Sequence, residues 1–190
     1  MKLRWGLVES CIKLSEFLSR WIAELSQYSS VSVHGVDGNH GEIRPLGSRK
    51  GEFENENLEK IMMWYLSTRF EDHDRVQIDA ASHRQKLVEV QGYRFLLTHG
   101  EDAKSLDALA KQTLLLYGER IDYFVCAHKH REQEMTTGYT DDGNTVVLRI
   151  PSLCGMDGYA QKLGYGGKPG ALCLVMEEGY GRRCMYPITL

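Results

Sequence analysis

The sequence lacks several features that would place it in a special class of proteins. Its five cysteines form no Cys-x-x-Cys pair, are odd in number and lie far apart, which argues against a zinc finger and a disulfide scaffold. No apolar run is long enough to span a bilayer, and the N-terminus is typical of a helix rather than a signal peptide. We therefore expect a cytoplasmic protein without a membrane partner.

An excess of charge of one sign is also missing. The formal net charge of −3 gives no electrostatic footprint for tight, nonspecific binding of nucleic acid. A local basic cluster remains at Arg44, Arg49 and Lys50. There is no internal repeat, low-complexity tract or interdomain linker, so 190 residues of ordinary composition predict one domain over residues 1–190.

Hydrophobic periodicity predicts helices that alternate with strands early in the chain, and strands that follow one another late. Apolar residues at three- and four-residue steps predict an amphipathic helix over residues 7–25. This order favours an α/β fold, an αββα sandwich in which helices flank two sheets. The other predicted helices are 55–70 and 105–117, and the predicted strands are 31–36, 75–79, a hairpin over 86–98, 123–127, 145–150, 171–176 and 184–188.

Three of these strands are followed by residues that commonly bind metals. Asn39 and His40 follow the first strand, His99 follows the hairpin, and His128 and His130 follow the strand near residue 125. Ligands collect at the carboxyl ends of strands in α/β sheets. A His-x-His pair on a strand end would point both imidazoles the same way, toward one metal or two neighbouring metals.

Each segment also has an ordinary explanation when it is taken alone. The His-x-His pair could be a surface pair, with one histidine bound to Glu132 or Glu134. His99 could cap a helix or lie in a loop, and Asn39 could be part of a Gly-Asn turn. The occurrence of all three at separate strand ends favours a metal site.

These segments resemble a known family. Gly38-Asn39-His40, Thr98-His99-Gly100-Glu101 and Ala127-His128-Lys129-His130 are similar to the last three motifs of the calcineurin-like metallophosphoesterases, especially bacteriophage and prophage versions and the nuclease branch. The resemblance covers essentially the whole chain. It implies that Asn39, His99 and His128 bind one metal and that His130 binds a second. It also implies that His40 lies beside the scissile phosphate and stabilises or protonates the leaving oxygen, and we consider Arg44 as a substrate contact.

The sequence departs from the family pattern in three places. Ala127 replaces the usual Gly, a small change if φ is negative there, and Gly41 replaces the acidic residue that usually follows Asn-His. The family's first two motifs, Asp-x-His and Gly-Asp-x-x-Asp, are absent, and Asp37 does not match the missing bridging aspartate. We therefore expect a fold truncated at its N-terminus, with three of four ligands for one metal and one for the other.

The resemblance implies a metal-dependent phosphoesterase. Such an enzyme hydrolyses phosphodiesters or phosphomonoesters, including nucleic acid, through a metal-bound hydroxide. The divalent metal would be Mn, Zn, Ni or Fe, with two ions in the complete family site and one in this chain. The alternatives are a catalytically inactive metal-binding or interaction remnant, and a gene start assigned too far downstream, which the preceding DNA would reveal.

The remaining signals concern packing and association. His34 is predicted to be packed and His73 solvated, while Ser82-His83 lacks the glycine-framed turn of a serine hydrolase. Loss of N-terminal strands would leave an open strand edge and uncovered helix faces. We therefore expect a homo-oligomer. The first helix would make that contact or fill the gap, and its candidate residues are Trp5, Leu14, Trp21 and Ile22.

Overall fold

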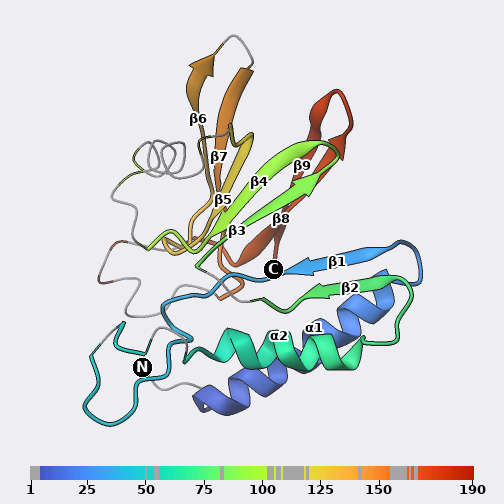
Figure 1. Ribbon diagram of the computed structural model, residues 1–190. Coiled ribbons are helices and arrows are strands. Elements are labelled where there is room, and N and C mark those ends of the chain that lie inside the picture. Colours follow the sequence, from blue (N-terminus) through green and yellow to red (C-terminus); the bar gives the residue numbers. More distant parts are fainter. Residues whose placement is uncertain are drawn as a thin grey trace. The chain divides into compact units, whose positions relative to one another are not determined.

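The structure is a computed structural model in which the chain forms two compact units, Lys2–Arg84 and Gln85–Leu190. Figure 1 labels the helices and strands of both units. The described residues are 5–49, 51–53, 56–81, 84–101, 105, 108, 118, 120–140, 143–154, 162, 164 and 167–190.

The N-terminal unit contains two helices and a pair of parallel strands. Helix α1 (Leu7–Leu25) has the predicted bounds, and strand β1 (Val31–His34) pairs with β2 (Val76–Asp79). Helix α2 (Leu58–Arg69) begins three residues later than predicted, because Asn57 caps it by accepting the Glu59 backbone N–H. Both helices lie on the same side of the strand pair (Figure 1). Their shared core consists of Ile22, Met63, Leu66, Phe70 and Val76.

The C-terminal unit is built on a mixed five-stranded sheet with the order β3-β4-β5-β7-β6. The central strands β4, β5 and β7 are parallel, and β3 and β6 pair antiparallel at the edges. A separate antiparallel pair, β8 with β9, completes the unit. The bounds are β3 Gln85–Val90, β4 Tyr93–Thr98, β5 Tyr123–Cys126, β6 Gln133–Thr140, β7 Gly143–Arg149, β8 Gly170–Glu177 and β9 Gly181–Thr189.

The predicted hairpin is confirmed, and its turn shows why the sequence signal was clear. Gln91 and Gly92 connect β3 to β4 with φ values of 52° and 75°, the left-handed pair that a tight two-residue hairpin turn requires. Strand β6 was not predicted. It pairs only with β7 at the sheet edge, and its sequence QEMTTGYT has little apolar alternation.

Both faces of the five-stranded sheet contain buried side chains. Leu96, Phe124 and Val147, each at most 1% exposed, form a core on one face together with Cys126. On the other face Phe95 stacks on Tyr123 with ring centroids 4.6 Å apart. The β8–β9 hairpin covers this second face through Leu174, Met176 and Met185. The chain is therefore a mixed α/β protein, and the complete αββα sandwich stays a prediction.

The predicted helix over residues 105–117 falls largely outside the described residues. Ser105 Oγ accepts the Ala108 backbone N–H at 3.1 Å, the bond by which a serine caps the start of a helix.

Candidate metal centre

The strand pairing in the C-terminal unit brings His99 and His128 to the same end of the sheet, just beyond the carboxyl ends of two neighbouring strands. Strands β4 and β5 are parallel neighbours, and their last residues, Thr98 and Cys126, are partners in the register. The Ala127 backbone N–H donates to the His99 carbonyl oxygen at 3.1 Å, so the pairing continues one residue beyond the strands. The two segments that follow, although distant in sequence, leave the sheet side by side.

The His99 and His128 imidazoles contact each other at this end of the sheet. His128 Nδ1 lies 3.1 Å from His99 Nε2, and the rings meet edge to face with centroids 5.0 Å apart. One tautomer of the pair makes a direct hydrogen bond across this distance. Two nitrogens that bind one ion at about 2.0–2.1 Å, with an angle of about 90–110° between the bonds, are separated by about 2.9–3.4 Å. The spacing of the pair therefore fits two ligands of a single divalent ion.

The His-x-His segment is a turn and not the end of a strand. Strand β5 ends at Cys126, and His128 and His130 have φ values of 60° and 50°. The Lys129 backbone N–H donates to the Ala127 carbonyl oxygen at 2.7 Å, which tightens the turn. The prediction that strand alternation aims both histidines the same way was therefore wrong. Left-handed backbone is uncommon for residues other than glycine and is found often at functional sites.

Ala127 tolerates its position because its φ is not among the positive values. Replacing the family's glycine with alanine therefore introduces no backbone strain at this point. His130 is half-buried, and within the described ranges no three His, Cys, Asp or Glu side chains gather closely enough to hold a metal ion. The assignment of His130 to a second metal stays a prediction.

The alternative that a surface histidine of the His-x-His segment binds Glu134 is not supported, because Glu134 has another partner. Glu134, which could have bound a histidine, pairs with Arg182 of β9 through contacts of 2.7 and 2.9 Å. These hydrogen bonds from the Arg182 guanidinium lower the pKa of the Glu134 carboxyl. No local pattern predicts this pair, because its two residues lie 48 positions apart.

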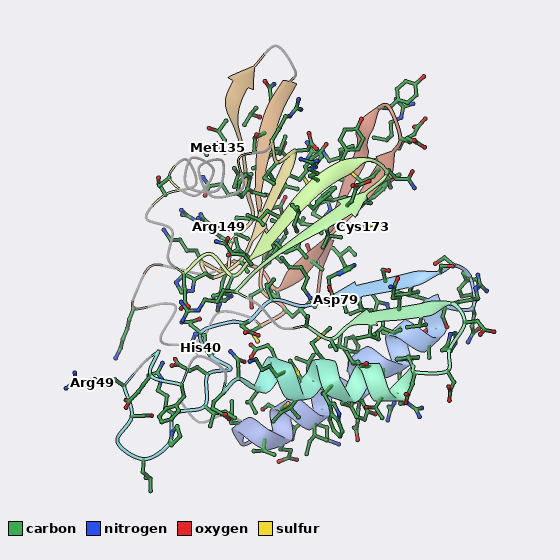
Figure 2. All side chains as sticks on the ribbon, in the orientation of Figure 1. His40, Arg49, Asp79, Met135, Arg149 and Cys173 are labelled. Carbon is green, nitrogen blue, oxygen red and sulfur yellow. The ribbon has the colours of Figure 1, made fainter. Side chains whose placement is uncertain are left out.

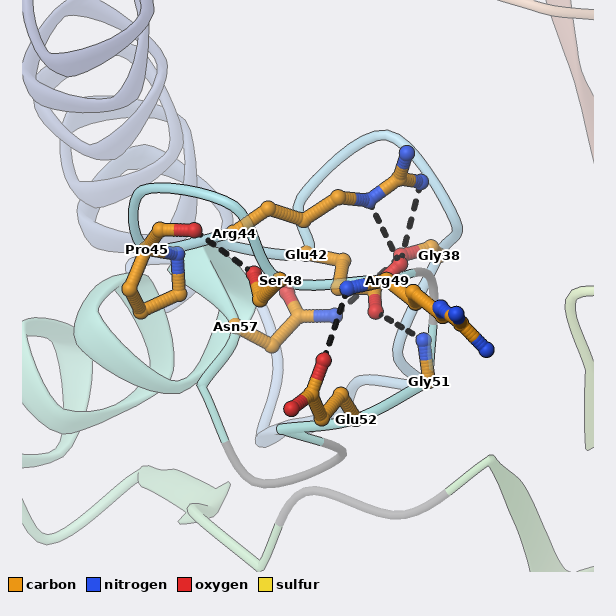
Figure 3. A network of polar contacts seen from close by, with 9 residues as sticks. All are labelled: Gly38, Glu42, Arg44, Pro45, Ser48, Arg49, Gly51, Glu52 and Asn57. Carbon is orange, nitrogen blue, oxygen red and sulfur yellow. Dashed lines mark hydrogen bonds and ion pairs between the residues drawn. The ribbon is translucent and has the colours of Figure 1, made fainter.

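Asn39 and His40 belong to the N-terminal unit, in the loop between β1 and α2. The strand ends at His34, two residues earlier than predicted, so the Asn-His pair follows an extended segment rather than the strand itself. Asn39 is half-buried and the His40 ring is exposed; Figure 2 labels His40 in this loop. Asn57 donates from Nδ2 to the Gly38 carbonyl oxygen at 3.1 Å, which anchors the loop to the start of α2 (Figure 3).

The loop that follows holds Arg44 in an ion pair. Arg44 donates from Nε and Nη2 to Glu42 Oε2 at 3.2 and 3.1 Å, and the Gly51 backbone N–H donates to the other Glu42 oxygen (Figure 3). Arg49 bonds Glu52 through its backbone N–H, while its side chain is exposed. Glu42 already neutralises Arg44, so the selection of Arg44 as a substrate contact stays a prediction.

Glu59, in the first turn of α2, is a residue that the sequence analysis missed. Burial raises the pKa of its carboxyl, hydrogen bonds from the Glu59 and Gly38 backbone N–H groups lower it, and the nearby Asp37 raises it. A glutamate two residues after a capping asparagine is common at the start of a helix, so only its burial sets it apart.

The other histidines have local structural contacts. His34, the last residue of β1, lies 3.3 Å from Asp79 at the end of β2. His73 is exposed as predicted, and its Nε2 lies 3.4 Å from Ser26 Oγ. Ser82 and His83 lie outside the described residues.

No helix in the described part of the chain is long and apolar enough to cross a membrane.

Solved structures with a similar chain course include metal-bound and phosphodiester-cleaving proteins. Vps29 from Entamoeba histolytica complexed with zinc is 14% identical, with a TM-score of 0.42 over 61% of this chain and 66% of that chain. An archaeal phosphodiesterase is 16% identical, with a TM-score of 0.47 over 89% of this chain and 74% of that chain. At these values no residue's role is carried over from either protein.

Among curated proteins, the chain is similar to the SPbeta prophage-derived uncharacterized protein YonJ of Bacillus subtilis (strain 168). The two are 27% identical over 192 residues, which cover 99% of this chain and 47% of YonJ. The chain therefore spans about half the length of the curated relative it matches. No family model matches the sequence.

Proposed function

We propose that this chain carries the Asn39, His40, His99, His128 and His130 part of a metal-dependent phosphoesterase site of the calcineurin-like type. The substrate would be a phosphodiester or phosphomonoester, including nucleic acid. The observation that supports this proposal most strongly is the pair of imidazole nitrogens 3.1 Å apart, presented by two parallel strand ends. The left-handed backbone of His128 adds to it, because such strain is commonly retained where a side chain must be aimed.

The proposed roles follow from the chemistry of the side chains. Asn39, His99 and His128 would hold one divalent ion through an amide oxygen and two imidazole nitrogens, and His130 would serve a second ion. A bound divalent ion polarises phosphoryl oxygens and lowers the pKa of water. His40, which is exposed, would donate a hydrogen bond or a proton to the leaving oxygen.

The composition of the ligand set favours a second candidate function. Asn and His are neutral ligands, and the sequence contains neither Asp-x-His nor Gly-Asp-x-x-Asp to supply the carboxylates of a two-metal site. Two close dications need anionic ligands to offset their charge. A metal-binding or interaction module without catalysis is therefore the alternative to the enzyme.

Titration calorimetry with Mn²⁺ and Zn²⁺ tests the part of the proposal that both candidates share. We expect one divalent ion to bind, because His130 alone supplies too few ligands for the second. We expect His99→Ala and His128→Ala each to weaken binding by about 10–100-fold, as loss of a ligand or its close support typically does. His73→Ala, an exposed histidine in the other unit, is the matched control. Equal affinity in all four proteins would overturn the proposal.

A further inference from the structure

The Asn39-His40 pair is bracketed by contacts from the first turn of α2. On one side of the pair, the Gly38 carbonyl oxygen accepts from Asn57 Nδ2 at 3.1 Å, and the Gly38 backbone N–H lowers the pKa of the nearby Glu59 carboxyl. On the other side, the Gly41 carbonyl oxygen accepts the Leu58 backbone N–H at 2.9 Å. The two residues between these anchors have little freedom to move independently of α2.

Gly41 lacks a side chain because α2 already fills that space. A Cβ built on Gly41 would overlap the Glu59 carboxylate and the Asn57 amide oxygen. Gly41 is buried and its φ is not among the positive values, so a conformational need for glycine does not explain it. The family pattern has an acidic residue at this position, and the carboxylate beside the Asn-His pair here comes from Glu59 instead.

Burial of the Glu59 carboxylate costs free energy that an exposed glutamate at this position would not lose. A glutamate in the first helical turn would be favourable while exposed, because it faces the positive end of the helix dipole. Here the carboxylate lies against the loop at Gly41, and its Oε2 is buried without a hydrogen-bond partner among the described residues. Burying a charged oxygen without a partner costs free energy, which the anchoring of the loop offsets.

We propose that Glu59, together with Asn57, is the positioning residue that fixes Asn39 and His40, and that Gly41 is glycine in order to admit the Glu59 carboxylate. This inference deepens the proposed function and rests on it for the roles of Asn39 and His40. Glu59 would act through the loop backbone, without touching metal or substrate.

Hydrogen exchange on the full chain, measured by mass spectrometry over residues 36–43, tests the anchoring without any metal. Glu59→Ala removes the carboxylate that packs against the loop at Gly41, so exchange of these amides should accelerate at least about tenfold. Glu59→Gln retains an acceptor oxygen and should restore most of the protection. Glu56→Ala removes an exposed carboxylate at the same helix start and is the matched control.

A double-mutant cycle tests whether a side chain at position 41 and the Glu59 carboxylate compete for the same space. Gly41→Ala alone should accelerate exchange, because its methyl group displaces the carboxylate. In the Glu59→Ala background the same change should have a smaller effect, because only the overlap with the Asn57 amide oxygen remains. Equal effects of Gly41→Ala in both backgrounds, or unchanged exchange in Glu59→Ala, would overturn the inference.

Metal titration separates this inference from the proposed function. We expect Glu59→Ala to weaken Mn²⁺ binding by about tenfold, since about 1.4 kcal/mol of lost ligand positioning has that effect. If the wild type binds no metal, the proposed function fails and hydrogen exchange alone decides the anchoring. If metal binds and Glu59→Ala loosens the loop without changing affinity, the positioning role fails and the proposed function stands.

Discussion

At the scale of single residues, the backbone of the His-x-His turn stores free energy that a different residue would release. His128 and His130 both have positive φ values, whereas left-handed backbone costs an L-residue about 1–2 kcal/mol. Glycine avoids that cost, although it adds entropy to the unfolded chain. A histidine occupies each position despite this cost, which supports the proposed ligand role.

Replacement of His130 by glycine should therefore stabilise the protein. We expect His130→Gly to raise the free energy of unfolding by up to about 1 kcal/mol, after subtraction of the entropy that glycine adds to the unfolded chain. Arg131→Gly, next in the chain and without positive φ, should lower it by about 0.5–1 kcal/mol. Urea unfolding measures both, and changes of the same sign would show that His130 is unstrained.

The Glu134–Arg182 pair predicts a specific response to acid. Hydrogen bonds from Arg182 lower the pKa of Glu134 below its ordinary 4.5, so the folded state holds the ionised form more firmly than the unfolded state does. The resulting stabilisation is complete above pH 4.5 and is lost as the pH falls through the lowered pKa.

Urea unfolding between pH 7 and pH 3 measures this response. Relative to wild type, Glu134→Gln should reduce stability at neutral pH by at most about 1 kcal/mol, because the pair is only partly buried, and should lose less on acidification. Glu132→Gln, an exposed neighbour, is the control. A wild-type acid response that persists unchanged in Glu134→Gln would contradict the assignment.

At the scale of secondary structure elements, α1 presents its larger apolar side chains to solvent. Its buried face includes Cys11, Ser15 and Ser19, and Cys11 Sγ lies 3.9 Å from the Leu58 carbonyl oxygen at the start of α2. The exposed side chains recur with the three-, four- and seven-residue spacing of a helix–helix seam. They are Leu7, Leu14, Phe17, Trp21, Leu25 and Tyr28, which we call the α1 stripe. Ile22, predicted as part of this contact, is instead 4% exposed in the core.

The α1 stripe makes the predicted homo-oligomer testable. A contiguous row of exposed large apolar side chains commonly marks a contact between proteins. We expect sedimentation at micromolar concentration to show a dimer, and Phe17→Glu or Trp21→Glu to yield monomers.

Val8→Glu and Ile12→Glu supply matched controls on the same helix. Both residues are apolar and as exposed as Trp21, yet they lie outside the stripe (66% and 52%, against 51%). These variants should remain dimeric. A wild-type monomer of 21.7 kDa, or equal dissociation in controls and stripe variants, would disprove self-association through α1.

At the scale of the whole molecule, the sequence predicted the elements better than their edges and contacts. Periodicity located α1 to the residue, and Gln91-Gly92 identified the hairpin, because both signals are local. The edge strand β6 was not predicted, since a strand paired on one side needs little apolar alternation. The candidate ligands were visible as motifs, but the proposed positioning role of Glu59 depends on a contact between the loop and the helix start that no spacing rule describes.

Catalysis by the 190-residue polypeptide should be weak. The sequence contains no bridging carboxylate motif, so we expect poor hydrolysis of p-nitrophenyl phosphate even with added Mn²⁺, each tenfold loss in rate corresponding to about 1.4 kcal/mol of barrier. A colorimetric assay with bis-p-nitrophenyl phosphate as a second substrate measures this. Robust turnover that His40→Ala abolishes would show that other groups replace the missing motifs.

The Cys126 thiol can report when the carboxyl ends of β4 and β5, which precede His99 and His128, open to solvent. This cysteine is 2% exposed, ends β5 one residue before the His-bearing turn, and has a pKa that burial raises. Alkylating reagents attack the thiolate, so Cys126 should react only when those strand ends open, whereas the exposed Cys154 and Cys173 should react at once. The delay between the two labelling phases would time the opening of the strand ends, and a divalent ion held by His99 and His128 should lengthen it.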